Sequence, residues 1–182
     1  KTPPKPSKLP EKSTFDLVQL FQPDEKMNTL HSFKVEGIEG EEIDFAAFAG
    51  KKIMVVNVAS ECGLTPQYQQ LQELYEEFGD KFVIIGFPAN NFGGQEPGSN
   101  SDIQAFCSRR YGVSFPLAAK IDIRTHPVYR WLTQKSENGV LDSQVTWNFQ
   151  KYLLDESGRL VHCLPPDASP LDEKVLEWLS KP

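Results

Sequence analysis

The sequence predicts an α/β fold with a mixed central sheet flanked by helices. Residues 53–58 form a largely β-branched apolar run, short enough for a strand that is buried on both faces. Apolar residues then recur at helical spacing up to residue 78, and residues 82–87 form a second buried run. Two parallel strands joined by a helix form a right-handed crossover. We expect this strand–helix–strand unit to form the centre of the fold.

Capping residues predict where the helices begin. Thr65 is the expected N-cap of the first helix, because Pro66 then occupies the first helical position. Asn100 is expected to cap a helix at residues 101–111. The last helix is expected to begin with Ser169 as its N-cap, followed by a proline and an acidic first turn.

The other segments add to the sheet and connect its strands. Residues 30–45 contain two strand-like stretches around a glycine-containing turn, which predicts an N-terminal β-hairpin. In chain order, the remaining expected elements are a short helix or strand at 15–20, a strand at 115–123, a helix at 126–135, a polar loop at 136–146 and a hairpin with strands at 151–154 and 159–163.

Length and composition fit one domain. The chain has 182 residues, of which 39% are hydrophobic, enough for a core that folds alone. Residues 1–13 combine proline and lysine with little to bury, so we expect a flexible tether there and a single domain at 14–182. The chain does not begin with Met, so the compartment stays open: cytoplasmic by default, exported or membrane-tethered if an upstream signal was removed.

Charge and cysteine content exclude several classes of function. A net charge of −6 argues against a nucleic acid or an anionic membrane as partner, and no run approaches the ~20 apolar residues of a membrane span. The cysteines, Cys62, Cys107 and Cys163, are too few and too widely spaced for a disulfide scaffold or a paired zinc site. The sequence therefore predicts no metal, no cofactor and no stable membrane insertion. The remaining interpretation of the three cysteines is that they are reactive or buried thiols.

Cys62 lies in the loop between the first buried strand and its helix. Unpaired N–H groups at a helix N-terminus favour an anion and hence the thiolate, which is the nucleophilic form of cysteine. Glu61 acts in the opposite direction, because a neighbouring carboxylate disfavours a second negative charge. The sequence alone leaves the balance between these two effects open.

Four blocks of the chain resemble the glutathione peroxidase family. They are NVASECGLTPQY at 57–68, GFPANNFGGQEPGSN at 86–100, FCSRRYGVSFPLAAKIDI at 106–123 and WNFQKYL at 147–153. Four blocks in the family's order are far more specific than a single motif. The resemblance implies a thioredoxin-like fold and a catalytic tetrad that reduces peroxides, which falls on Cys62, Gln95, Trp147 and Asn148.

The implied reaction explains these residue types. A thiolate attacks one oxygen of the O–O bond while the leaving oxygen is protonated and its charge is stabilised by positioned donors. Gln95, the Trp147 indole and Asn148 are uncharged donors that suit both a thiolate and a developing oxyanion. Taken singly, Cys62 and Trp147 would be interpreted as core residues and the two amides as turn residues; only the joint pattern assigns them a function.

The other cysteines have less specific interpretations. Cys107 follows the apolar spacing of its helix, so packing is one reading. In family members that use thioredoxin, a cysteine at the matching position is the resolving residue, which implies a Cys62–Cys107 disulfide. A disulfide needs Cα atoms within ~7 Å, so we expect the helix around Cys107 to unwind locally. Cys163 is expected to be a packed or spare thiol.

The sequence thus predicts a thiol peroxidase for hydrogen peroxide and for organic or lipid hydroperoxides. The expected reductant is thioredoxin or a relative, with glutathione less favoured, and the short 136–146 link implies a monomer by comparison with the tetrameric members of the family. Whether Cys62 replaces a native selenocysteine stays open. An alternative is a redox relay that passes oxidation of Cys62 to a partner protein. A disulfide oxidoreductase is disfavoured because Cys62 is not part of a CxxC pair.

Overall fold

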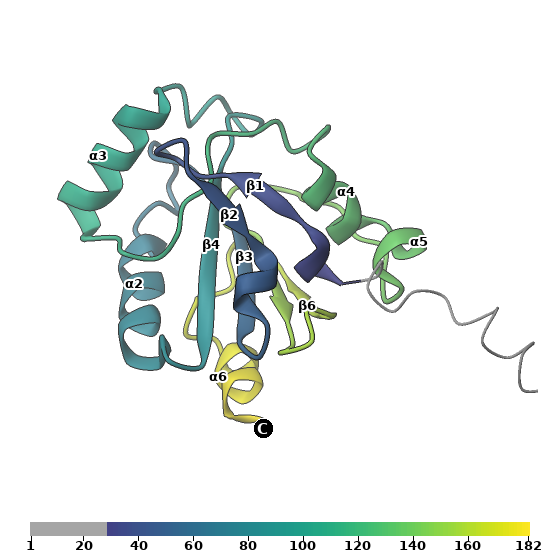
Figure 1. Ribbon diagram of the computed structural model, residues 1–182. Helices are drawn as coiled ribbons and strands as arrows, with labels where there is room; N and C mark the ends of the chain where they lie inside the picture. The colour runs from purple at the N-terminus through teal and green to yellow at the C-terminus, as the bar shows by residue number, and fades with distance from the viewer. Residues whose placement is uncertain (1–28) are drawn as a thin grey trace, which may run out of the picture.

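The structure is a computed structural model and describes residues 29–182. The tether predicted at 1–13, the element predicted at 15–20 and the first part of the domain predicted at 14–182 lie outside these residues. The described chain folds around a four-stranded sheet in the order β4-β3-β5-β6 (Figure 1). β3 (Lys52–Val58) and β4 (Phe82–Pro88) are parallel, whereas β5 (Lys151–Leu154) and β6 (Leu160–Leu164) are antiparallel additions, so the mixed sheet is confirmed.

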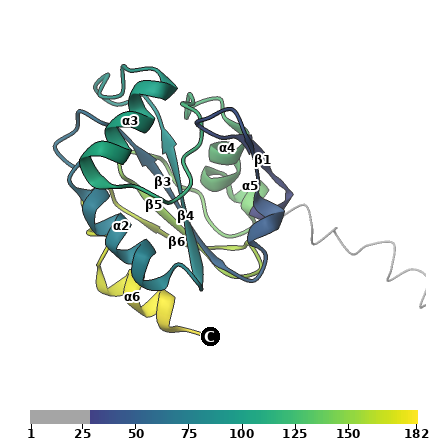
Figure 2. The same ribbon diagram turned by 60° about the vertical axis from the view of Figure 1, so that its left-hand side comes forward.

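Helices cover both faces of this sheet, as Figure 2 shows. α2 (Gln67–Phe78), α3 (Asn100–Tyr111) and α6 (Glu173–Ser180) lie on one side, and α4 (Pro127–Thr133) with the short α5 (Lys135–Asn138) on the other. Successive residues of β3 point to opposite faces. Val55 therefore joins the apolar cluster under α4, and Met54 joins the cluster under α2 and α6.

The N-terminal hairpin is also confirmed. β1 (Lys34–Glu36) pairs antiparallel with β2 (Glu42–Asp44) around the expected glycine turn. Two short 3-10 helices, η3 (Leu30–Ser32) and η4 (Phe45–Phe48), flank the hairpin. Within residues 29–182, no helix is long and apolar enough to cross a membrane.

The strand predicted at 115–123 is wrong. This segment meets β4 only through the isolated bridges Gly86–Leu117 and Ala89–Ile121. Its backbone hydrogen bonds are shared among different neighbours: Ala118 N–H donates to Gly86 in β4, whereas Ala119 N–H donates to Glu36 in β1. Two further N–H groups bond side chains instead of a strand: Lys120 N–H donates to Asn100 Oδ1 and Ile123 N–H to Asn91 Oδ1, so no continuous ladder forms.

The predicted caps shift by one to three residues. α2 begins at Gln67, with Pro66 as its N-cap, and Thr65 makes no cap because its hydroxyl donates inward to Ala59. Ser99 rather than Asn100 caps α3, in a capping box with Asp102. These two shifts leave the start of each helix close to its predicted place.

Smaller differences concern the second half of the chain. The hydroxyl of Ser169 accepts from Leu171 N–H in a local turn, so Pro170 precedes α6 and Asp172 is the N-cap. The helix predicted at 126–135 ends at Thr133, and α5 occupies the start of the segment predicted as a loop at 136–146. The hairpin predicted at 151–154 and 159–163 is confirmed as β5 and β6.

β5 carries a buried lysine, and we expect it to make stability depend on pH. Lys151 Nζ donates to the carbonyls of Pro166 and Ala168, and burial lowers the pKa of Lys151 to about 7 despite the nearby acids Asp167 and Asp172. Between pH 7 and the usual value of 10.5, the unfolded chain therefore binds more protons than the folded one. Stability rises with pH in that window, by at most about 1.4 kcal/mol per pH unit from this amine.

Urea unfolding of the wild type and of Lys151→Met at pH 7.0, 7.75 and 8.5 tests this. The variant is expected to be less stable at each pH, because two carbonyls lose their donor, and to show a flatter rise with pH. Equal pH slopes in the two proteins would contradict the assignment.

Candidate active site

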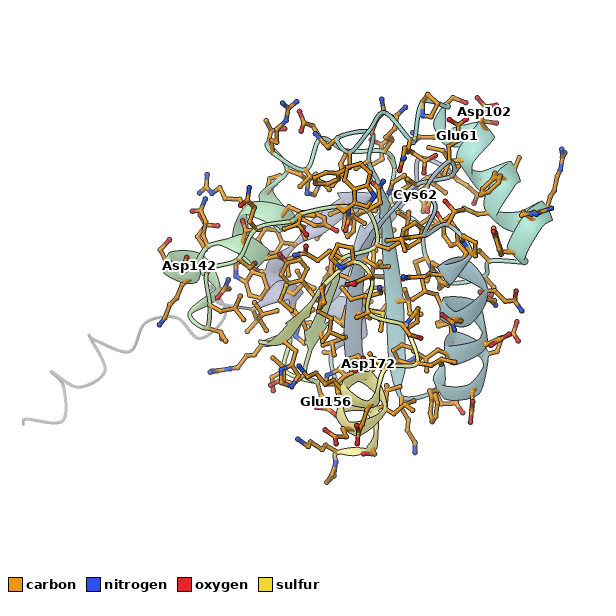
Figure 3. All side chains as sticks on the ribbon, turned by 180° about the vertical axis from the view of Figure 1, so that it is seen from behind. Glu61, Cys62, Asp102, Asp142, Glu156 and Asp172 are labelled. Atoms are coloured by element: carbon orange, nitrogen blue, oxygen red, sulfur yellow. The ribbon has the colours of Figure 1, made fainter. Side chains whose placement is uncertain are left out.

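Cys62 lies in a tight turn between β3 and α2. Its backbone N–H donates to Thr65 Oγ1 (2.9 Å), and its carbonyl accepts from the N–H of Thr65 (3.0 Å). Cys62 Sγ accepts a hydrogen bond from Leu64 N–H (3.3 Å), and the residue is only 9% exposed. Figure 3 shows Cys62 and Glu61 at the end of the sheet near Asp102 of α3.

The loop after β4 joins this turn directly. Glu61 N–H donates to the carbonyl of Gln95 (3.0 Å), so the backbone of the predicted site residue Gln95 lies beside the Cys62 turn. This arrangement agrees with the expectation that loops after the carboxyl ends of parallel strands share one edge of the sheet. The loop itself is held in shape because Glu96 N–H donates to Asn90 Oδ1 (2.9 Å).

The structure also brings Gln95, Trp147 and Asn148 together. Asn148 Nδ2 donates to Gln95 Oε1 (2.9 Å), which leaves the Gln95 amide nitrogen as the donor that faces away from this pair. Gly93 lies between the side chains of Trp147 and Gln95. A Cβ at this position would stand 3.1 Å from Trp147 Cη2 and 3.3 Å from Gln95 Cγ. Any other residue would press on these side chains and be strained, because φ here is also positive (66°).

Trp147 and Asn148 differ sharply in exposure. Trp147 is 37% exposed and packs against Phe92, with ring centroids 5.8 Å apart, whereas Asn148 is fully buried. In the described part of the chain, Asn148 Oδ1 has no hydrogen-bond partner, and the side chains of Gln95, Trp147 and Asn148 do not donate to Cys62 Sγ. Trp147 thus presents its indole at the surface beside a buried amide, where a peroxide from solvent can approach.

Asn57 holds the 147–150 segment in place, a role that the sequence alone does not predict. Asn57 is fully buried in β3. Its Nδ2 donates to the Trp147 carbonyl (3.0 Å), its Oδ1 accepts from Gln150 N–H (3.1 Å), and its own carbonyl accepts from Phe149 N–H (2.6 Å). Phe149 has φ of 67°, which is costly for a residue other than glycine. The sequence carries one signal of this role: Asn57 is a polar residue inside an otherwise apolar strand.

We therefore expect Asn57→Ala to slow the oxidation of Cys62 about tenfold to a hundredfold, because the Trp147–Asn148 segment loses its side-chain contacts to β3. Stopped-flow tryptophan fluorescence with hydrogen peroxide measures this rate. Asn138→Ala is the matched control: Asn138 is also buried, but its side chain bonds the carbonyls of Trp131 and Leu141 and no group of residues 147–150. Equal slowing in both variants would assign Asn57 a general structural role only.

Cys107 is buried in α3 and carries a protonated thiol. It is 1% exposed, and burial raises its pKa to about 11, although the nearby Tyr68 hydroxyl acts in the opposite direction. Cys107 and Cys62 belong to the same apolar cluster, and both thiols are free. A thiol with this pKa is a poor nucleophile where it lies, which agrees with the expectation that α3 must open before Cys107 reacts.

Cys163 lies apart from the tetrad. It is half-buried in β6, and its Sγ accepts from Gln150 Nε2 (3.3 Å). Burial raises its pKa, so this thiol is also protonated near neutral pH. Its reading as a packed or spare thiol stays a prediction.

The chain matches known proteins over most of its described length. The family model for glutathione peroxidase matches residues 30–133. A glutathione peroxidase homolog BsaA of Halalkalibacterium halodurans is 42% identical over 150 residues, which cover 80% of this chain and 95% of the relative. A hydroperoxy fatty acid reductase gpx1 of Synechocystis is 42% identical over 143 residues, which cover 74% of this chain and 85% of the relative.

Solved structures agree in fold. The crystal structure of Trgpx in apo form superposes with a TM-score of 0.64 at 31% identity, covering 85% of this chain and 97% of that one. A thiol:disulfide interchange protein of the thioredoxin family from Chlorobium tepidum superposes with a TM-score of 0.57 at 18% identity, covering 81% and 93% of the two chains. The second likeness concerns the fold alone and confirms that it is thioredoxin-like.

Fold and relatives together define the protein as a thiol peroxidase on a thioredoxin-like fold, an enzyme that reduces hydroperoxides. The chain belongs to the glutathione peroxidase family. The roles assigned to individual site residues remain predictions.

Proposed function

We propose that the enzyme reduces hydroperoxides through Cys62 and is reset through a disulfide with Cys107. The Cys62 thiolate attacks the terminal peroxide oxygen, the O–O bond breaks, and the leaving oxygen takes a proton to depart as an alcohol or as water. Cys62 is then a sulfenic acid. The observation that supports this most directly is the meeting of the Gln95, Trp147 and Asn148 side chains, together with the hydrogen bond from Glu61 in the Cys62 turn to the Gln95 carbonyl.

The neutral donors suit this first step. In the proposal, the free amide nitrogen of Gln95 and the indole N–H of Trp147 stabilise the thiolate and then the negative charge that develops on the leaving oxygen. Asn148 holds the Gln95 amide in the orientation that exposes its nitrogen. None of the three carries a charge that would bind the thiolate as a tight ion pair.

Cys107 completes the cycle. Its thiolate attacks the sulfenic sulfur of Cys62, the S–O bond breaks, and hydroxide leaves as water after taking the proton that Cys107 gave up. A thioredoxin-type dithiol then reduces the Cys62–Cys107 disulfide and becomes a disulfide itself. We also propose that the protein is a monomer, because the 136–146 link is short by comparison with that of the tetrameric members of the family.

Consumption of NADPH in two coupled assays tests the reductant. With hydrogen peroxide as substrate, one assay contains thioredoxin and its reductase, and the other contains glutathione and its reductase. Sustained turnover is expected in the first and at least tenfold slower turnover in the second. Cys163→Ser is the control and keeps the wild-type preference. Faster turnover with glutathione would contradict the two-cysteine cycle.

A further inference from the structure

A hollow of about 240 Å³ lies between the Cys62 turn and α3. Its walls come from the turn, from the loop after β4 and from the helix, and they include Ser60, Glu61, Glu96, Asp102 and Ile103. Figure 3 shows Glu61 and Asp102, which both line the hollow, close together at the end of the sheet beyond Cys62. We call it the α3 hollow.

Glu96 brings a buried carboxyl group to the α3 hollow. The residue is only 1% exposed, and its Oε2 is buried without a hydrogen-bond partner among the described residues. Lys120 makes no ion pair with this carboxyl, because Lys120 Nζ donates to the backbone carbonyls of Glu96 (3.3 Å) and Gly98 (2.6 Å). A buried carboxyl oxygen with an unused acceptor is costly, so it calls for an explanation.

Cys107 lies on the side of α3 that faces this hollow. Ile103 and Cys107 are one helical turn apart and are the two buried residues of α3, so they share its inward face. Ile103 lines the hollow together with Glu96, which places Cys107 one turn further along the same face. The electrostatics agree: after burial, the charge of Glu96 is among the causes that raise the pKa of the Cys107 thiol.

The surroundings of Glu96 make it a stronger base than an ordinary glutamate. Burial raises its pKa above the usual value of 4.5, and the negative charge of Glu61 adds to this rise. Contacts with Ser60 and the positive charge of Lys120 limit it. General base catalysis becomes more efficient as the pKa of the base approaches the working pH.

The other titratable groups beside Glu96 are poorly placed to accept a proton. Tyr68 of α2 and Cys107 are uncharged near neutral pH, because burial raises the pKa of each. Asp102 is engaged in the capping box of α3, where its Oδ2 accepts from Ser99 N–H (3.1 Å) and contacts with Ser99 lower its pKa. Glu96 is thus the buried carboxyl on this face of α3 with an acceptor to spare.

We propose that Glu96 is the base that takes the proton of Cys107 when α3 opens and returns it to the hydroxide that leaves Cys62. This inference rests on the proposed two-cysteine cycle and assigns its proton transfer. The Cys107 S–H bond breaks and the proton moves to the Glu96 carboxylate. The Cys107 sulfur then bonds the sulfenic sulfur of Cys62, and the S–O bond breaks.

The step balances without an added reagent. The sulfur of Cys107 is oxidised and the sulfenic sulfur of Cys62 is reduced as the disulfide forms. The departing hydroxide takes the proton from the Glu96 carboxylic acid and leaves as water, so the carboxylate is regenerated. A carboxylate between the Cys62 turn and α3 can serve both sulfur atoms in turn.

The pH dependence of disulfide formation tests the role of Glu96. The full chain is mixed with one equivalent of hydrogen peroxide between pH 5.5 and 8 and quenched in acid at successive times, and mass spectrometry measures the peptide pair linked through Cys62 and Cys107. In the wild type, the rate is expected to reach a plateau above the pKa of Glu96. In Glu96→Gln, it is expected to be at least tenfold lower at pH 7.

The variant is also expected to lose the plateau. Cys107 must then give its proton to solvent, so the rate rises about tenfold per pH unit and the gap to the wild type narrows. Glu96→Asp keeps a carboxylate and is expected to keep the plateau. Asp102→Asn is the matched control: it makes the same chemical change at the same hollow, weakens the start of α3, and is expected to keep the wild-type pH profile.

Oxidation of Cys62, followed by stopped-flow tryptophan fluorescence, is the internal reference. Disulfide formation in Glu96→Gln with the wild-type rate and pH profile would overturn the inference and leave the two-cysteine cycle intact. Equal slowing of both steps in Glu96→Gln, or loss of the plateau in Asp102→Asn as well, would also overturn it. Absence of the linked peptide in the wild type would instead overturn the cycle and the inference together.

Discussion

Cys62→Ser is expected to lose hydroperoxide reduction by roughly 10³-fold or more with every substrate. Serine keeps the size of the side chain and its place beside Leu64 N–H, but its hydroxyl is not ionised near neutral pH, so the attacking anion is missing. The loss appears directly as the absence of NADPH consumption in the thioredoxin-coupled assay. The Cys62 turn is held by backbone and Thr65 contacts, so the variant is expected to fold.

Circular dichroism and thermal unfolding of Cys62→Ser verify that the fold is kept. Cys163→Ser serves as the matched thiol control and is expected to retain activity, because Cys163 lies on β6 and contacts Gln150 rather than the tetrad. Hydroperoxide breakdown that survives in Cys62→Ser at the wild-type rate would remove the basis of the proposed mechanism.

Cys107→Ser is expected to separate the two halves of the cycle. The first oxidation of Cys62 continues at the wild-type rate, since Cys107 is buried in α3 and takes no part in the attack on peroxide. Turnover with thioredoxin falls roughly a hundredfold, because an intramolecular thiol at high effective concentration is replaced by one that must arrive from solution.

Mass spectrometry after one equivalent of hydrogen peroxide measures the outcome. The wild type is expected to yield a peptide pair linked through Cys62 and Cys107, and Cys107→Ser a sulfenic acid on Cys62 that a trapping reagent captures. A stable sulfenic acid in the wild type, with no linkage to Cys107, would rule out the resolving role.

Sequence patterns predicted the central elements well because those elements are buried on both sides. The apolar runs at 53–58 and 82–87 predicted β3 and β4, and both strands are buried throughout. The segment at 115–123 is also rich in apolar residues, but its Lys120 and Ile123 N–H groups bond the side chains of Asn100 and Asn91 rather than a neighbouring strand. Hydrogen-bond partners of this kind depend on the tertiary arrangement, which local composition does not encode. The capping errors have a similar cause, since the Thr65 hydroxyl is used by Ala59.

The candidate site was predictable only through the family resemblance. Spacing alone places Cys62 in a strand-to-helix loop, but nothing local connects it with Asn148, which lies 86 residues further along the chain. The missed residue, Asn57, acts through backbone groups of the 147–150 segment, and a contact with backbone leaves no complementary side chain to recognise.

The few buried residues of α3 have a consequence for the oxidised enzyme. Of its own residues, α3 buries only Ile103 and Cys107; a capping box of Ser99 and Asp102 stabilises its start, and Gly112 in the left-handed conformation caps its end. In the proposed cycle Cys107 leaves the interior to bond Cys62, and α3 then loses one of its two buried side chains. We therefore expect the oxidised and reduced proteins to differ in shape around α3, a difference that a reductant could recognise before any thiol exchange begins.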